Sequence, residues 1–116
     1  MKDKNSLFKK IFEEFLDDLE VIKPYDPALT LARSATGFLP AELMISQFRE
    51  NTRAYKDKII QRDEVFFLNN NFEDAGDFKE EIDRIKSIWY DESVSSEDKE
   101  IVWNYLILLV KIAFLD

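Results

Sequence analysis

Apolar residues recur every three or four positions along most of the chain, which is the spacing of one face of an α-helix. Asn5 or Ser6 would cap the first helix, and Pro24 would end it near Lys23, because proline disfavours helical geometry in the residue before it. The pattern therefore predicts an amphipathic first helix. Its apolar stripe consists of Phe8, Ile11, Phe12, Phe15, Leu16, Leu19 and Ile22.

Two further helical segments follow. Asp26 and Pro27 are a typical N-cap and first helical residue, and Gly37 is expected to end this second helix in the left-handed conformation. Pro40 is expected to open a third helix, in which Thr52 bridges a gap in the apolar stripe. The pattern leaves open a break near residues 51–52. The apolar positions are Leu29, Leu31, Ala32 and Ala35 in the second helix, and Leu43, Met44, Phe48, Tyr55 and Ile59 in the third.

The segment 63–74, DEVFFLNNNFED, places aromatic residues beside three consecutive asparagines. Its core, EVFFL, has β propensity, but no second strand is evident to pair with it, so we predict a short helix over Glu64–Leu68. A loop over Asn69–Asp77 would follow. Phe66, Phe67 and Phe72 would then either anchor this element on a helical bundle, the preferred interpretation, or form an exposed patch that binds a partner.

Two helices complete the pattern. Asp77 would cap a helix that ends near Tyr90, and Ser95 would cap the last one, with Asp98 three residues later as in a capping box. The inward positions of the first of these helices are Phe78, Ile82, Ile85, Ile88 and Trp89.

The last helix differs from the others because nearly all of its positions are apolar. Between Ile101 and Leu115 only Asn104 and Lys111 are clearly polar. A helix that is apolar all round lies either in the centre of a core or against another chain. The preferred interpretation is a central helix, and a homodimer formed through this helix is the alternative.

Composition agrees with a helical fold. Two Gly and three Pro are too few for the many turns of an all-β protein. With 116 residues, 46% of them apolar and 34% charged, the chain is long enough for one core. We therefore expect a single all-α domain over residues 1–116, built from about five or six helices packed around the apolar C-terminal helix.

The residue types restrict the possible chemistry. The chain has no His and no Cys, which excludes Ser-His-Asp and Cys-His nucleophilic sites and the usual Cys/His zinc sites. Its two isolated glycines cannot form a phosphate-binding loop. A calcium-loop frame could begin at Asn69, but its sixth position is Asp74 where glycine is required. We expect no catalytic residue, no metal site and no cofactor, and hence no enzyme.

Charge is distributed unevenly. The net charge of −8 disfavours broad binding to nucleic acid or anionic membranes, and neither a signal peptide nor a membrane span is evident, so an intracellular protein is expected. Segment 47–62, in contrast, carries five cations against two acids, a local charge of +3. This basic stripe consists of Arg49, Arg53, Lys56, Lys58 and Arg62. It would either bind an acidic partner or phosphates, or pair with the protein's own acids, and the second interpretation is preferred.

Several segments together resemble a family. They are FLDDL (15–19), PAELMISQF (40–48), YKDKIIQRDEVFFLNNNF (55–72) and EIDRIKSIWYDESVSSEDKEIVWNYLILLVKIA (81–113). In this order they are similar to a group of small helical, uncharacterised proteins encoded by nucleocytoplasmic large DNA viruses, over roughly residues 8–113. The resemblance implies an intracellular viral protein and transfers no functional residue.

These observations favour a non-enzymatic protein that binds other proteins or itself, associated with the virion, with assembly or with a host partner. The alternative is a nucleic-acid-associated protein that uses the basic stripe over residues 49–62.

Overall fold

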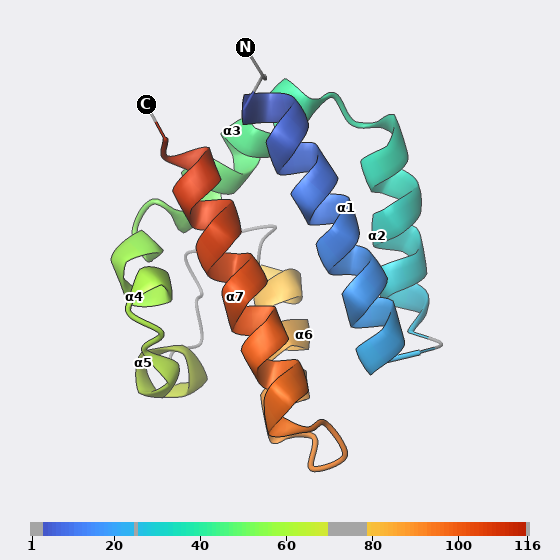
Figure 1. Cartoon of the computed structure of the whole chain (residues 1–116), viewed down its shortest axis with the longest axis vertical. Helices are drawn as coiled ribbons and strands as arrows, with labels where there is room; N and C mark the ends of the chain where they lie inside the picture. Colours follow the sequence, from blue (N-terminus) through green and yellow to red (C-terminus); the bar gives the residue numbers. More distant parts are fainter. Residues whose placement is uncertain (1–3, 25, 70–78, 116) are drawn as a thin grey trace.

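The computed structural model describes residues 4–24, 26–69 and 79–115, and within these ranges it contains only helices (Figure 1). The expected all-α class is confirmed. The described ranges hold seven helices rather than five or six, because the expected third helix is divided in two. They are α1 Lys4–Ile22, α2 Pro27–Phe38, α3 Ala41–Thr52, α4 Lys56–Ile60, α5 Glu64–Asn69, α6 Lys79–Tyr90 and α7 Ser96–Ala113.

The C-terminal helix α7 is the centre of the fold, as predicted. It packs against α1, α3 and α4, and Val102, Leu109 and Ala113 are completely buried. Ser95 caps its first turn, since the Ser95 Oγ accepts a hydrogen bond from the Asp98 N–H at 3.1 Å. Leu108, on the outward side, remains partly exposed. Neither α7 nor any other helix of the described ranges is long and apolar enough to cross a membrane.

Helix α1 supplies the aromatic part of the core. The Phe8 ring is buried and lies 5.1 Å from the Phe48 ring of α3, and the Phe15 ring stacks on Tyr105 of α7 at 5.2 Å. The predicted cap is wrong, because Asn5 and Ser6 lie inside the first turn of α1. Both residues have helical backbone geometry, so neither occupies the extended position of an N-cap.

Helix α2 departs from the sequence pattern at two points. Gly37 lies within α2 and does not end it, and the helix stops at Phe38 because Pro40 disfavours helical geometry in Leu39. Leu31, expected on the apolar face, is exposed. Helix α2 packs mainly against α1, where Arg33 forms ion pairs with Asp17 and Glu20.

The break in the expected third helix follows a buried threonine. Thr52 fills the gap in the stripe as predicted, and its hydroxyl donates to the Phe48 carbonyl at 2.6 Å. Such a bond competes with the backbone ladder and often bends a helix. The chain turns over residues 53–55 before α4 begins, so residues 49–62 do not share one helical face.

Helix α4 ends in a Schellman motif built around Arg62. The Asp63 N–H donates to the Lys58 carbonyl at 3.1 Å, and the Arg62 N–H donates to the Ile59 carbonyl at 3.0 Å. This motif requires a left-handed residue, and Arg62 has φ 55°. Glycine usually occupies this position, so an arginine here bears a conformational cost that other contacts must offset.

Candidate functional site

A concave surface lies between α2 and the rest of the bundle, and we call it the α2 groove. Helix α2 flanks α1 at the edge of the molecule (Figure 1) and forms one wall, while α3 and α6 form the other. The groove has a volume of about 300 Å³ and is open to the surface. Its floor is made of apolar side chains of α1 and α7, namely Phe8, Phe12, Phe15, Leu16, Leu19, Leu106 and Leu109.

The two walls differ in polarity. The α2 wall is apolar and consists mainly of Leu29, Ala32 and Ala35. The opposite wall adds polar groups to its apolar ones, with Gln47 and Asn51 from α3 and Ser87 from α6. An apolar floor with a few polar groups at the rim is the usual composition of a binding pocket in a protein.

Apolar residues continue from the groove onto the outer surface of α2. Leu31, Ala35 and Phe38 are spaced at i, i+4 and i+7, so they lie along one side of the helix. Ala35 is both exposed and part of the groove lining, while Leu31 is 72% exposed and Phe38 is 90% exposed. Large apolar side chains exposed in a row beside a concave surface are typical of an interaction site.

The lining of the α2 groove includes two charged residues, Lys23 and Asp26, and Lys9 donates to the carbonyl of the lining residue Leu39 at 2.9 Å. Lys23 is the only cation among the described lining residues, and its Nζ lies 2.5 Å from Asp91 Oδ2. This bond, with hydrogen bonds from Ser93, holds the pKa of Asp91 well below its usual range. Asp26 also lines the groove, and Asp83 is exposed one turn before Ser87 on α6.

Of the predicted aromatic residues, Phe66 and Phe67 lie on α5, outside the lining of the α2 groove. Phe67 packs edge-on against Trp103 of α7 at 5.6 Å and is half-buried. Phe66 is also half-buried and lies 6.2 Å from the Tyr55 ring. Both contacts agree with the anchor interpretation of these two residues. Phe72 lies outside the described residues, as do Phe78, Asp77 and most of the calcium-loop frame considered above.

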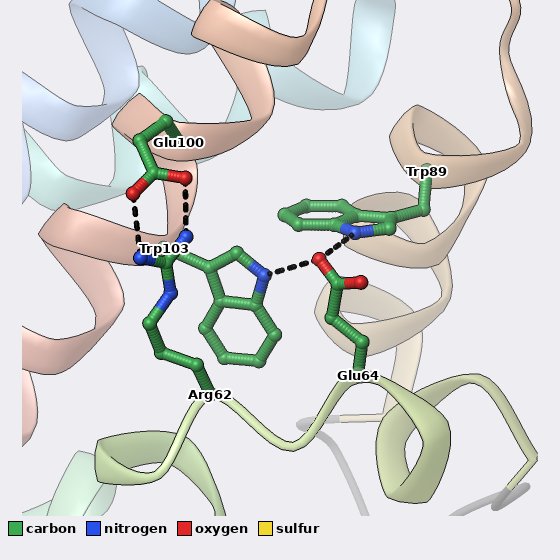
Figure 2. A network of polar contacts seen from close by, with 5 residues as sticks. All are labelled: Arg62, Glu64, Trp89, Glu100 and Trp103. Atoms are coloured by element: carbon green, nitrogen blue, oxygen red, sulfur yellow. Dashed lines mark hydrogen bonds and ion pairs between the residues drawn. The ribbon is translucent and has the colours of Figure 1, made fainter.

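A polar network holds the same corner in place (Figure 2). The Glu64 Oε1 accepts hydrogen bonds from the indole N–H of Trp89 at 3.0 Å and of Trp103 at 3.1 Å. Beside it, the Arg62 guanidinium forms a two-pronged ion pair with Glu100 of α7, which lowers the pKa of Glu100. Helix α5 has no fully buried residue, so these contacts and the Phe67 ring attach it to α6 and α7.

We expect Phe67→Ala to lower the free energy of unfolding by about 2 kcal/mol, less than the roughly 3–5 kcal/mol typical of a fully buried Phe. The ring is half-buried and loses its contact with Trp103. Urea unfolding measures this change, with Val65→Ala on the exposed side of the same helix as the control. An unchanged unfolding midpoint would show that Phe67 does not anchor α5.

The basic stripe is engaged within the protein. Arg49 and Lys56 both lie over the Phe114 ring, at 5.4 and 4.7 Å from its centroid. Arg53 pairs with Glu50 at 3.7 Å, Lys58 with Asp63 at 3.6 Å, and Arg62 with Glu100. These contacts agree with the intramolecular interpretation of the stripe. They also spread the five cations over two helices and two turns, which disfavours a continuous phosphate-binding face.

Tyr105 has the most perturbed tyrosine environment among the described residues. Burial raises the pKa of its phenol to about 12, with further contributions from its hydrogen bond to Asp18 and from the negative charges of Asp18, Glu14 and Asp17. The folded state therefore holds this proton more tightly than the unfolded chain, where the pKa is about 10.

The consequence is a loss of stability in alkali. The contribution of Tyr105 should be complete below pH of about 10 and should disappear as the pH rises toward about 12. Absorbance titration of the phenolates should show a late step near pH of about 12, and Tyr105→Phe should remove that step. A titration in which the late step persists in Tyr105→Phe would assign it to another residue.

The α2 groove was not predicted from the sequence. The one available signal is the spacing of Leu31, Ala35 and Phe38, of which the sequence analysis assigns Leu31 and Ala35 to the apolar face of the second helix. Within the described ranges, no group of three or more Asp or Glu side chains is arranged to hold a metal ion. Comparison with known proteins yields no match among protein-family models, curated proteins or solved structures.

Proposed function

We propose that this protein is a non-enzymatic interaction module that binds a segment of another protein in the α2 groove. The observation that carries the proposal is an open apolar groove of about 300 Å³ bordered by the exposed side chains of Leu31 and Phe38. A groove of this volume accommodates a few large apolar side chains, which act as the anchors of a protein interface.

The aromatic motif and the basic stripe are weaker candidates for a partner-binding surface, because their described residues already make contacts within the protein. Phe66 and Phe67 are half-buried beside the rings of Tyr55 and Trp103, and the stripe cations contact Phe114, Glu50, Asp63 and Glu100. The α2 groove is therefore the better candidate surface for a partner. The resemblance to proteins of large DNA viruses would make that partner a virion, assembly or host protein.

Site-directed photo-crosslinking tests this proposal. A benzophenone amino acid in place of Phe38, at the rim of the groove, should capture a partner in native cell extract. The same group in place of Val65, which is exposed on the distant helix α5, should not capture it.

A second substitution, made in the protein that carries the benzophenone residue, tests whether the partner is captured in the groove. Ala35→Gln places a longer, polar side chain at an exposed position of the lining and should abolish capture, whereas Ser34→Gln, also exposed but outside the lining, should not. Both changes keep a good helix former on α2, and matching thermal unfolding would confirm that both variants fold. Capture that is insensitive to Ala35→Gln would refute the proposal.

A further inference from the structure

We infer that helix α5 is a strap that detaches from α6 and α7 while the rest of the bundle stays folded. Its detachment exposes Phe66 and Phe67 and uncovers residues of α3, α4 and α7 that α5 covers in the closed state. This inference does not rest on the function proposed above. Three features of the structure support it, namely the burial of α5, the nature of its contacts and the backbone before it.

Helix α5 is the least buried helix of the described ranges. Each of the other six contributes at least one side chain to the core, including Ile59 from the five-residue helix α4. In α5, by contrast, Phe66, Phe67 and Leu68 are only half-buried, and Val65 is 69% exposed. A helix of six residues is too short to be stable without its neighbours, so burial must hold it in place. Little burial therefore opposes the detachment of α5.

The contact between α5 and the bundle is incomplete. A cavity of about 40 Å³ lies beneath α5, which contributes Glu64, Phe67 and Leu68 to its lining. Side chains that face a void lose the dispersion contacts that a packed neighbour would supply, so the cavity weakens the attachment of α5. The rest of the lining consists of Phe48, Thr52, Ile59, Lys86, Trp89, Trp103 and Leu106.

The polar contacts of α5 lie at the surface. The exposed side chain of Glu64 accepts the two indole N–H groups of Trp89 and Trp103 (Figure 2). The adjacent ion pair joins Arg62 and Glu100, whose side chains are 38% and 53% exposed. Exposed ion pairs contribute little to stability, because water and salt screen them. These contacts place α5 correctly without fastening it strongly.

The backbone before α5 favours a hinge at Arg62. This residue has φ 55°, a conformation that is disfavoured for any residue with a Cβ. Detachment of α5 would free Arg62 to leave the left-handed region, which recovers that conformational cost. The closed state of the strap therefore stores strain at the position where the strap joins α4.

Detachment exposes residues that the closed state buries. Thr52, Ile59 and Trp103 line the cavity beneath α5 and are 0%, 4% and 4% exposed. Phe66 and Phe67 become accessible in the same step. The two interpretations of these phenylalanines, as an anchor and as an exposed aromatic patch, then describe the closed and the open states of one strap.

Thiol labelling in native conditions tests the inference, because the chain has no cysteine and an introduced one is the only thiol. Thr52→Cys places the thiol beneath α5, and Val110→Cys places it in the core, outside the lining of the cavity. Ellman's reagent should label Thr52→Cys at least about tenfold faster, through local opening. That rate should depend weakly on urea, since detaching one short helix exposes little surface, whereas labelling of Val110→Cys should rise steeply.

Further substitutions in the two labelling variants identify the moving element. Glu64→Ala removes both indole hydrogen bonds and should accelerate labelling of Thr52→Cys about tenfold. Glu92→Ala, at an exposed position in the turn before α7, should not. Phe15→Ala destabilises the core at a residue outside the lining of the cavity, so it should accelerate labelling of Val110→Cys with little effect on Thr52→Cys.

The indole N–H of Trp103 repeats the test in the unmodified protein and decides it if Thr52→Cys does not fold. This group donates to Glu64 and belongs to a residue that is 4% exposed, so its hydrogen exchange, followed by NMR, should also depend weakly on urea. Equal rates and equal urea dependence at the two thiols, or exchange of the Trp103 N–H only through global unfolding, would refute the inference. Labelling of Thr52→Cys that Glu64→Ala leaves unchanged would refute it too, since the opening would not involve α5.

Discussion

Leu109→Asp is expected to leave the chain unfolded at room temperature. Leu109 is 0% exposed in the middle of α7, the helix against which α1, α3 and α4 pack. An aspartate there would be either an unpaired buried charge or a protonated acid in an apolar site, and it would also lose the packing of the leucine. Together these effects are comparable to the total stability of a domain, about 5–15 kcal/mol.

The neighbouring residue supplies the control for this experiment. Leu108 lies on the outward side of the same helix and is 41% exposed, so Leu108→Asp should leave a folded protein. Circular dichroism and size-exclusion chromatography would distinguish the two variants, because only Leu109→Asp should lose helical signal and elute as an expanded chain. A helical Leu109→Asp protein with native elution would show that α7 is not the centre of the core.

Phe8→Ala should have the second largest effect, a loss of about 4 kcal/mol in the free energy of unfolding. The Phe8 side chain is 1% exposed, and its ring contacts both Phe12 and Phe48. Removing the ring leaves a cavity and deletes two aromatic contacts, one of which joins α1 to α3.

Phe38→Ala is the control for Phe8→Ala, because it removes an exposed ring that contributes little to the stability of the fold. Its free energy of unfolding should stay within about 0.5 kcal/mol of the wild type, as is usual for surface positions. Denaturant titration of the two variants compares the burial of the two rings directly. Equal losses would contradict the placement of α2 at the edge of the bundle.

The parts of the fold that the sequence predicted are those determined by local pattern. The stripe from Phe8 to Leu19 indicated the buried face of α1, Ser95 indicated the start of α7, and Thr52 was expected to face inward. Each of these follows from residues within one or two helical turns of one another, so a single sequence contains the information.

The residues at which helices end or the chain turns were less predictable. Gly37 permits a left-handed conformation but does not impose one, and Pro40 determines where α2 ends. Among the described non-glycine positions, the left-handed residue is Arg62, which accepts this conformation in a loop held by its ion pair with Glu100. That partner is far away in sequence, so no local pattern could indicate it.

The candidate site depends on how helices that are far apart in sequence pack together, which no local sequence pattern indicates. The α2 groove exists because α2 packs mainly against α1 and leaves a gap toward α3 and α6. The arrangement of helices therefore decides whether Leu31 and Phe38 face solvent or the core. The same reason explains why the basic stripe, evident as a charge cluster in the sequence, is divided between partners in the fold.

The corner shown in Figure 2 also determines how this protein can be observed by spectroscopy. Both tryptophans of the chain are in it, with ring centroids 5.6 Å apart and planes at 83°, and both donate to Glu64. Intrinsic fluorescence and near-ultraviolet circular dichroism therefore report mainly on the junction of α5, α6 and α7. Detachment of α5 would change these signals before the rest of the bundle melts, whereas occupation of the α2 groove requires a reporter introduced on α2.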